Sequence, residues 1–244
     1  MLAFFKVVCY IPLYNGLIFL IGIIPGASVA VAVVLFTAFI KLLLFPLSYK
    51  AAKFQFEMKA HEAELNHIKE QFKNDKQAQG KAVLDFYRAK GVNPFAGLLP
   101  VLIQIPLIIS LYYVFFEGGL PAIDPTLLYS WVPVPKPDMF FWGVDIGTKS
   151  LLLAVLAGVT QFFQARLAMP PTPPQSSDAP SLSQDMARGM QFQMKYVLPI
   201  FMGFVSYQVS AAVALYFVTS NLFAIGQEIF MRRKFRKQAH STHS

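Results

Sequence analysis

A single lysine, Lys41, lies inside an apolar run of residues 27–47 that is otherwise long enough to cross a lipid bilayer. A lone ammonium group at membrane depth costs roughly 2.5–3.5 kcal/mol on insertion scales, so it needs a polar cavity or a route to the membrane surface. No acidic residue within the run offsets this charge. Lys41 is therefore the first candidate for a functional residue.

Thr37 lies four residues before Lys41, so the two side chains share one face of a helix. Other apolar runs also carry polar groups at membrane depth: Gln104, Ser110, Gln161, Ser220 and Asn221. If these polar faces converge, they line a hydrated cavity. The alternative is that each group makes an ordinary hydrogen bond between helices, worth about 0.6 kcal/mol on average.

Two interpretations of Lys41 stay open on physical grounds. The residue lies about 10 Å from the end of its span at Ser48, given the rise of an α-helix per residue, and a lysine side chain can cover much of that distance by snorkelling. In the other interpretation the ammonium group faces a hydrated cavity. Pro46 favours the cavity, because it disrupts the helix beside Lys41 and leaves carbonyls that water or protein must satisfy.

The composition places the chain among membrane proteins. Of its 244 residues, 55% are hydrophobic and only 14% are charged, with a mean hydropathy of +0.49. Cys9 is the only cysteine, so the chain has no internal disulfide and no thiolate metal cluster. Four histidines lie in polar segments without metal-ligand spacing, and the sequence has neither a phosphate-binding glycine loop nor a nucleophile elbow. We therefore expect no cofactor, no metal and no enzymatic activity.

The hydropathy pattern predicts an all-α, polytopic protein with five membrane spans. Three of them are predicted at residues 27–48, 93–116 and 149–168. Residues 195–231 hold the fourth and fifth, because one helix of that length would exceed about 50 Å, whereas a bilayer core is about 30 Å thick. The turn between these two spans is expected around residues 207–212.

Polar segments of distinct character join the predicted spans. Residues 49–92 carry nine basic and six acidic residues with apolar stripes at helical spacing, which predicts a soluble helical hairpin with a turn at residues 73–76 and Gly91 as its C-cap. Residues 117–148 form a loop with Trp131 and Trp142, as expected of an interfacial belt. A proline-rich loop follows at 169–194, and a basic tail ends the chain at 232–244.

Charge distribution orients these segments. Placing the hairpin, the tail and the proline-rich loop with the adjoining Arg166 and Lys195 on one side collects 17 of the 21 lysines and arginines there. This marks that side as cytoplasmic and the loop 117–148 as extracytoplasmic. The N-terminus is then outside and the C-terminus inside. The net charge of +8 thus reflects membrane orientation and not binding to DNA.

The N-terminal segment, residues 1–26, has two interpretations. Its apolar stretch is interrupted by proline and glycine, which suits an amphipathic or re-entrant helix at the interface. A signal peptide with a cleavage site among the small residues 26–30 is the alternative. The interfacial helix is favoured, because a new hydrophobic span begins at once and the charged leader is a single lysine.

Four segments carry a joint pattern: residues 37–47 (TAFIKLLLFPL), 92–106 (VNPF, then LPVLIQIP), 140–145 (FFWGVD) and 215–221 (LYFVTSN). From the first segment to the last, they are distributed over nearly the whole chain. Together they resemble the YidC-type membrane protein insertases, and in particular the compact members of that family. An arginine normally occupies the position of Lys41, and residues 208–212 lack the proline and glycine that the family often has there.

The resemblance implies five spans around a hydrophilic groove that is open to the cytoplasm and to lipid and sealed on the outer side. Polar tails of nascent membrane proteins would enter this groove, and apolar segments would leave it into lipid along Tyr216 and Phe217. The implied groove residues are Lys41, Thr37, Gln104, Ser110, Gln161, Ser220 and Asn221. The implied contacts to ribosome or lipid are Arg232, Arg233, Lys234, Arg236 and Lys237.

The same resemblance implies a multi-pass protein of the bacterial inner membrane whose partners are nascent membrane proteins, the bilayer, the ribosome and the Sec translocon. Two other functions stay open. A small solute or ion transporter with Lys41 as its binding charge would predict internal repeats or paired broken helices, and the sequence has no convincing repeat. In a structural assembly factor, Lys41 would merely snorkel.

Overall fold

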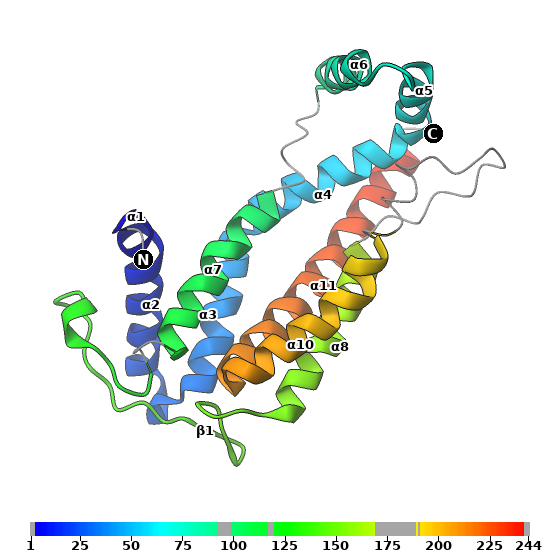
Figure 1. Cartoon of the computed structure of the whole chain (residues 1–244). Coiled ribbons are helices and arrows are strands. Elements are labelled where there is room, and N and C mark those ends of the chain that lie inside the picture. The colour runs from blue at the N-terminus through cyan, green and yellow to red at the C-terminus, as the bar shows by residue number, and fades with distance from the viewer. Residues whose placement is uncertain (1–2, 92–98, 117–119, 169–188, 190, 242–244) are drawn as a thin grey trace. The chain divides into compact units, whose positions relative to one another are not determined.

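The computed structural model describes residues 3–91, 99–116, 120–168, 189 and 191–241, and these residues are mostly helical (Figure 1). This confirms the predicted all-α, polytopic class. The residues divide into two compact units: unit 1 is Met1–Leu43 with Ile105–Glu228, and unit 2 is Leu44–Gln104 with Ile229–Ser244.

Three described helices are long and apolar enough to cross a membrane, and a fourth span results if one bent pair is counted as a unit. The three are Lys6–Ile23, Leu151–Ala168 and Ala211–Phe235, and the pair is Val29–Leu43 with Phe45–Met58. The predicted count of five spans stays a prediction. Of the predicted segments, residues 93–98 and most of the proline-rich loop 169–194 lie outside the described part of the chain.

The N-terminal helix belongs to the core of unit 1. The helical chain runs through α1 (Ala3–Phe5), η1 (Lys6–Tyr10) and α2 (Ile11–Ile23), and α2 contacts α3 (Val29–Leu43). The α2 side chains Tyr14, Leu17, Ile18 and Ile21 are almost completely buried. Because η1 and α2 together are also long enough to cross a bilayer, the interfacial placement of residues 1–26 stays a prediction.

A buried asparagine fastens α2 to the loop beyond α7 (Leu99–Phe116). Asn15 is 1% exposed; its Nδ2 donates to the carbonyl oxygen of Leu127 at 2.8 Å, and its Oδ1 accepts from the backbone N–H of Tyr129 at 2.6 Å. The neighbouring Tyr14 hydroxyl accepts from the backbone N–H of Asp124 at 2.9 Å. The loop around η4 (Pro125–Leu127) is thus held by side chains of α2.

Replacing Asn15 with leucine should destabilise unit 1. The substitution removes both partners of the loop backbone, and each buried polar group left unsatisfied costs about 1–3 kcal/mol. The free energy of unfolding in detergent, measured by denaturant titration, checks this. Ile23→Leu on the same helix is the control, because Ile23 is exposed. Equal losses in the two variants would contradict a specific role for the amide.

The helix that carries Lys41 ends earlier than residue 48, where the sequence placed the end of the first span. α3 ends at Leu43, the chain turns at Leu44, and α4 (Phe45–Ala60) begins with Pro46 as its second residue. In an unbroken helix the Pro46 ring would clash with the carbonyl of Leu42, whereas the first turn of a new helix tolerates proline. The predicted disruption beside Lys41 is therefore present as a break two residues before the proline.

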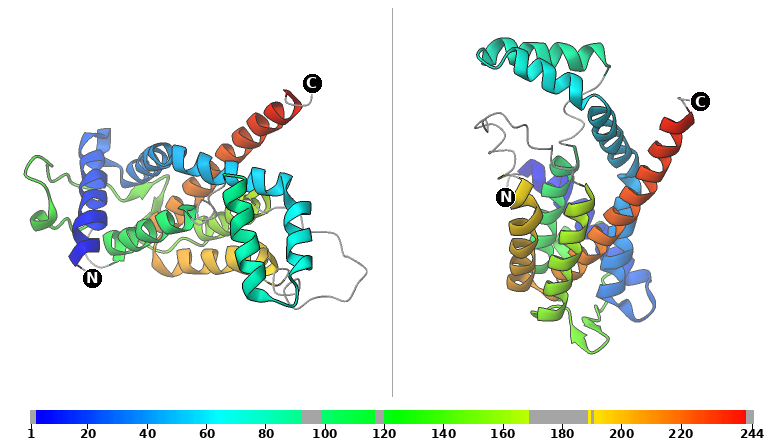
Figure 2. Two further views of the ribbon diagram at one scale, coloured as in Figure 1. Left: turned by 90° about the horizontal axis from the view of Figure 1, so that it is seen from above. Right: turned by 90° about the vertical axis from the view of Figure 1, so that its right-hand side faces the viewer.

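Two helices of unit 1 pack closely, and a third follows after a sharp break. α8 (Leu151–Ala168) and α10 (Leu198–Val209), which follows η5 (Gln193–Val197), lie side by side (Figure 2). α10 ends at Val209, Ser210 is extended with φ −166° and ψ 163°, and α11 (Ala211–Ser241) begins immediately. The break falls inside the segment 207–212, so a single serine suffices to reverse the chain without proline or glycine.

The hairpin of unit 2 consists of α5 (Glu62–Gln71) and α6 (Lys76–Ala89), which contact each other. Asp75 caps α6, because its carboxylate accepts from the backbone N–H groups of Gln77 and Ala78, each at 3.0 Å. Gly91 has φ +66°, the left-handed conformation predicted for its place just beyond the helix end. The predicted turn at residues 73–76 thus lies where α5 gives way to α6.

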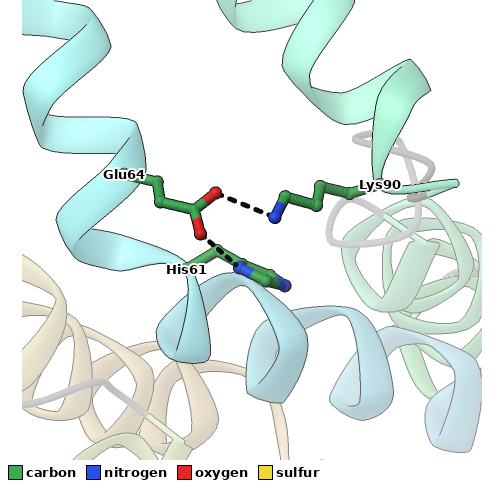
Figure 3. A network of polar contacts seen from close by, with 3 residues as sticks. All are labelled: His61, Glu64 and Lys90. Carbon is green, nitrogen blue, oxygen red and sulfur yellow. Dashed lines mark ion pairs between the residues drawn. The ribbon is translucent and has the colours of Figure 1, made fainter.

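A three-residue polar network joins the two ends of this hairpin (Figure 3). One oxygen of Glu64 lies 2.8 Å from the Lys90 ammonium group, and the other lies 3.5 Å from His61 Nδ1. The hydrogen bond from Lys90 is the main cause that lowers the pKa of Glu64 below its ordinary value of 4.5. Because the carboxylate is held ionised, this contact stabilises the closed hairpin at neutral pH.

Acidification should loosen the hairpin through Glu64. Because its pKa is lower in the folded state, the stabilisation is complete above pH 4.5 and is lost as the pH falls through the lowered value. Amide hydrogen exchange of α5 and α6, corrected for the intrinsic pH dependence of exchange, measures this loss. In Glu64→Gln the acid-dependent component should be absent, and an identical acid response in both proteins would refute the assignment to Glu64.

The basic segment predicted as a tail is a continuation of α11. The helix runs to Ser241 because no proline or glycine interrupts the sequence after Gly226 and because aromatic residues fasten it to α4 within unit 2. Phe235 is buried, and its ring centroid lies 5.3 Å from that of Tyr49 and 5.3 Å from that of Phe56. The segment is thus a packed helix because apolar residues recur along it. Its basic charge alone did not predict this packing.

Candidate functional site

A pocket lies within unit 1, with Lys41 in its lining. α3 contributes Lys41 and Thr37 because these residues are one helical turn apart. The wall opposite comes from α7, and further side chains come from α2 and α11. The polar groups of the lining are those of Lys41, Thr37, Ser110 and Tyr216, and apolar side chains form the rest.

Ser110 distinguishes this pocket from a simple packing defect. Its side chain is 1% exposed, and among the buried side-chain polar atoms of the described residues its Oγ is the one without a hydrogen-bond partner. A buried hydroxyl without a partner costs free energy comparable to a lost hydrogen bond. Such a group is suited to bind water or a polar group that enters the pocket.

The hydrogen bond of Thr37 agrees better with an ordinary structural role than with a role in solvating substrate. Its hydroxyl is buried and donates to the backbone carbonyl oxygen of Val33 at 2.6 Å, one turn earlier on α3. Its hydrogen-bond donor is therefore used within the helix. The oxygen keeps acceptor capacity, so Thr37 can still accept a hydrogen bond.

Gln227, which is not among the predicted groove residues, contacts the backbone beside Lys41. Gln227 on α11 donates from Nε2 to the carbonyl oxygen of Lys41 at 3.4 Å, while the Lys41 side chain is only partly buried. Gln227 joins α3 to α11 near the break at Leu44. A polar residue six positions after Asn221 in the apolar run was the available signal, and only the fold shows which backbone group it meets.

The other predicted groove residues do not all meet at this pocket. Asn221 on α11 donates to Thr160 Oγ1 at 3.2 Å and to the carbonyl oxygen of Ala157 at 3.4 Å, so it joins α11 to α8. Gln161 bonds to Gln164 within α8 at 3.3 Å. Ser220 is buried on α11. Gln104 belongs to unit 2 and is partly buried there.

The two residues predicted to contact apolar substrate segments are both buried. Tyr216 is 4% exposed and lines the pocket together with Lys41, whereas Phe217 is 3% exposed and belongs to the apolar core. Their ring centroids lie 5.3 Å apart in an edge-to-face arrangement. Their role as substrate contacts stays a prediction.

The backbone of the loop before α8 closes one end of the helices that bear the pocket. The N–H groups of Ala211 and Ala212 donate to the carbonyl oxygens of Thr148 at 2.7 Å and Ile146 at 2.9 Å. At the start of α3, the N–H of Val29 donates to the carbonyl oxygen of Asp138 at 3.0 Å. The first N–H groups of a helix have no partner within it, so this loop caps both helices and ties them together.

The basic residues of α11 lie in unit 2. Arg232, Arg233 and Lys234 are exposed, and the Lys234 ammonium group lies 4.9 Å from the ring centroid of Tyr49. The side chains of Arg236 and Lys237 lie outside the described part of the structure. A helix fastened by Phe235 presents the described charges on a fixed surface.

Within the described residues, no three side chains of His, Cys, Asp or Glu lie together as metal ligands would. Lys41, Thr37, Ser110 and Tyr216 are the pocket-lining residues whose side chains carry a polar group, and the accessible surface of the pocket itself is apolar. These groups can solvate and attract a polar or acidic group without bond chemistry.

Comparison with known proteins identifies the family. Residues 20–238 match the family described as 60Kd inner membrane protein. The membrane protein insertase YidC of Fusobacterium nucleatum subsp. nucleatum is 33% identical over 204 residues, covering 84% of this chain and 86% of that protein. The YidC insertase of Francisella tularensis subsp. novicida is 30% identical over 207 residues, and the chain spans about a third of its length, 32%. The chain therefore belongs to the 60Kd inner membrane protein family, the family of the YidC insertases.

Proposed function

We propose that this multi-pass bacterial inner membrane protein is a membrane protein insertase, which lets polar tails of nascent membrane proteins cross the bilayer through the pocket between α2, α3, α7 and α11. Crossing is opposed chiefly by the desolvation of polar groups in hydrocarbon. The pocket lowers this penalty, because Lys41, Ser110 and the Tyr216 hydroxyl offer polar partners at membrane depth. Apolar segments then leave into lipid past Tyr216 and Phe217.

The buried, unpartnered hydroxyl of Ser110 beside the only lysine of α3 carries this proposal. A dry bundle would satisfy such a hydroxyl within the protein, and a lysine that merely snorkels would not line a pocket with it. The backbone caps on α3 and α11 support closure of the site at one end. Entry from the other end agrees with the basic side of the chain facing the cytoplasm.

We further propose an N-terminus outside and a C-terminus in the cytoplasm, as the distribution of lysine and arginine indicates. In that orientation the α5–α6 hairpin receives nascent substrate. The exposed Arg232, Arg233 and Lys234, with Arg236 and Lys237 on the same helix, then contact the ribosome or anionic lipid. Cooperation with the Sec translocon is a separate part of the proposal that co-purification tests.

Water accessibility of the pocket tests the proposal. In a Cys9→Ser background, Lys41→Cys and Ser110→Cys should react with a membrane-impermeant maleimide added from one side of proteoliposomes, because the reaction needs a hydrated thiolate. Leu156→Cys, on the exposed face of α8, is the control and should stay unreactive in lipid. Unreactive cysteines at both 41 and 110 would exclude a hydrated pocket.

The insertion activity is tested with the same proteoliposomes. A substrate with a short polar tail is synthesised in their presence, and protection of the tail from added protease reports its transfer across the bilayer. We expect protection that depends on the protein. Accessible cysteines without tail protection would instead support a solute pathway, which flux measurements would identify.

A further inference from the structure

The β1–β2 hairpin displays a highly exposed tryptophan. Residues Phe140–Phe141 pair antiparallel with Val144–Asp145 in unit 1, at the element labelled β1 in Figure 1. Trp142 at the tip of this hairpin is 93% exposed, and Phe140 is 65% exposed. The Trp142 ring stacks on that of Phe141 with an interplanar angle of 4° and therefore extends an aromatic surface away from the core.

The backbone at this tip is unfavourable for tryptophan. Phe141 pairs with Val144, so Trp142 and Gly143 form a two-residue turn, and their φ values are 48° and 80°. Positive φ at both central residues defines a type I′ turn, whose first position favours Asn, Asp or Gly. A bulky residue in this conformation is strained, and such strain concentrates at functional sites. Tryptophan at this position therefore opposes the local conformational preference.

Hydrogen bonds hold the hairpin in a fixed place. Asp138 Oδ1 accepts from the backbone N–H of Phe140 at 2.9 Å, and Asp145 Oδ1 accepts from that of Gly147 at 2.8 Å. The carbonyl of Asp138 caps α3, and those of Ile146 and Thr148 cap α11. The hairpin is thus anchored at the N-terminal ends of the two helices that bear Lys41 and Tyr216.

Two candidate membrane spans begin at these helix ends. α8 and α11 are both candidate spans, and both begin beside the hairpin. α8 starts six residues after Asp145 with two apolar side chains that are 68% and 66% exposed, Leu151 and Leu152. The start of an exposed apolar span lies at the edge of the hydrocarbon core, where tryptophan is enriched because its ring is apolar and its N–H is polar.

We propose that the β1–β2 hairpin binds the lipid headgroup region of the adjoining leaflet through Trp142 and Phe140. The partner is the bilayer interface itself, since the exposed surface is aromatic and continuous with a lipid-facing span. Binding there fixes the depth of α3 and α11, because the loop that bears the hairpin caps both helices. Lys41 lies twelve residues after Val29, so the hairpin holds its Cα about 18 Å along the helix from that interface.

Tryptophan fluorescence tests the location of the ring. Trp131→Phe leaves Trp142 as the single tryptophan, and the variant is reconstituted into phosphatidylethanolamine–phosphatidylglycerol vesicles. We expect blue-shifted emission, weak quenching by acrylamide, and stronger quenching by lipids brominated near the headgroup than by lipids brominated near the chain end. Full quenching by acrylamide without any quenching by brominated lipid would overturn the proposal. It would show that the tip is exposed to water, where a protein partner could bind it.

A tryptophan placed on the soluble hairpin supplies the control. Gln77 is exposed on α6, so Gln77→Trp in a Trp131→Phe, Trp142→Phe background should be quenched by acrylamide and insensitive to brominated lipid. Strongest quenching of Trp142 by deep bromines would also contradict the proposal, because it would place the ring in the hydrocarbon core.

A second variant tests depth control without loss of the fold. Trp142→Asn removes the ring but creates the Asn–Gly pair that type I′ turns prefer. The free energy of unfolding of this variant in detergent should therefore not be lower than that of the wild-type protein. In the Cys9→Ser background, Val31→Cys on α3 should react faster with aqueous maleimide when Trp142 is replaced by Asn, because α3 is no longer held at its depth. Equal rates would overturn the depth-setting role, and restoration by Trp142→Tyr would support it.

Discussion

Substrates with acidic tails should insert at least about tenfold more slowly into vesicles that contain the Lys41→Ala variant, since hydrogen bonds to charged groups contribute roughly 1.5–3 kcal/mol. Lys41 lines the pocket of unit 1 together with Ser110, Thr37 and Tyr216. An acidic group that passes through it exchanges water for these partners. Alanine removes the one positive charge of α3 and leaves hydroxyl groups alone to solvate the tail.

The Lys41→Arg variant distinguishes the effect of the positive charge from that of the side-chain shape. Lys41→Arg keeps the charge that the family resemblance places here and should retain insertion of acidic tails, although a planar guanidinium group forms hydrogen bonds in a different geometry. Neutral polar tails should be affected little by either variant. Protease protection of radiolabelled tails measures the insertion rates of the wild-type protein, Lys41→Ala and Lys41→Arg. Equal insertion of acidic tails by the wild-type protein and Lys41→Ala would disprove the attraction by charge.

Helical periodicity predicted part of this site. Thr37 and Lys41 share a helix face because they are four residues apart, and the structure places both in the pocket. Ser110 came from a different apolar run, and nothing local indicated that its face would meet theirs. Periodicity defines the faces of one helix, whereas the choice of partner helix depends on packing across the whole fold.

Asn221 and Asn15 illustrate what a single sequence leaves undetermined. Asn221 was expected in the groove, but its Nδ2 bonds to Thr160 and Ala157, as in an ordinary interhelical contact. Asn15 of the N-terminal segment was not among the predicted polar residues, although its amide joins α2 to the loop at Leu127 and Tyr129. A buried amide has the same sequence signature in a groove and in a structural joint, because both require polarity at membrane depth.

The helices α8 and α10 owe their close approach to two glycines. A Cβ atom on Gly158 would lie 3.2 Å from the carbonyl oxygen of Pro199, and one on Gly203 would lie 3.2 Å from that of Ala154. Both obstacles are backbone atoms, which cannot rotate away as a side chain can. Small residues at helix crossings allow such close packing in membranes, where lipid provides no hydrophobic drive between helices.

Gly158→Leu should therefore destabilise unit 1 by about 1–3 kcal/mol or more, the usual range for overpacking of a close contact. Separation of α8 from α10 also disturbs the carbonyl of Ala157, which holds Asn221 of the pocket helix α11, so insertion should weaken together with stability. Thermal unfolding in detergent and tail protection in vesicles measure the two effects. Gly226→Leu on α11 adds the same side chain where no atom outside the neighbouring helix backbone lies within 4 Å of the new Cβ. It should not lower stability, because leucine favours a helix more than glycine does. If Gly158→Leu unfolds at the same temperature as Gly226→Leu, the glycine contact contributes nothing that leucine cannot replace.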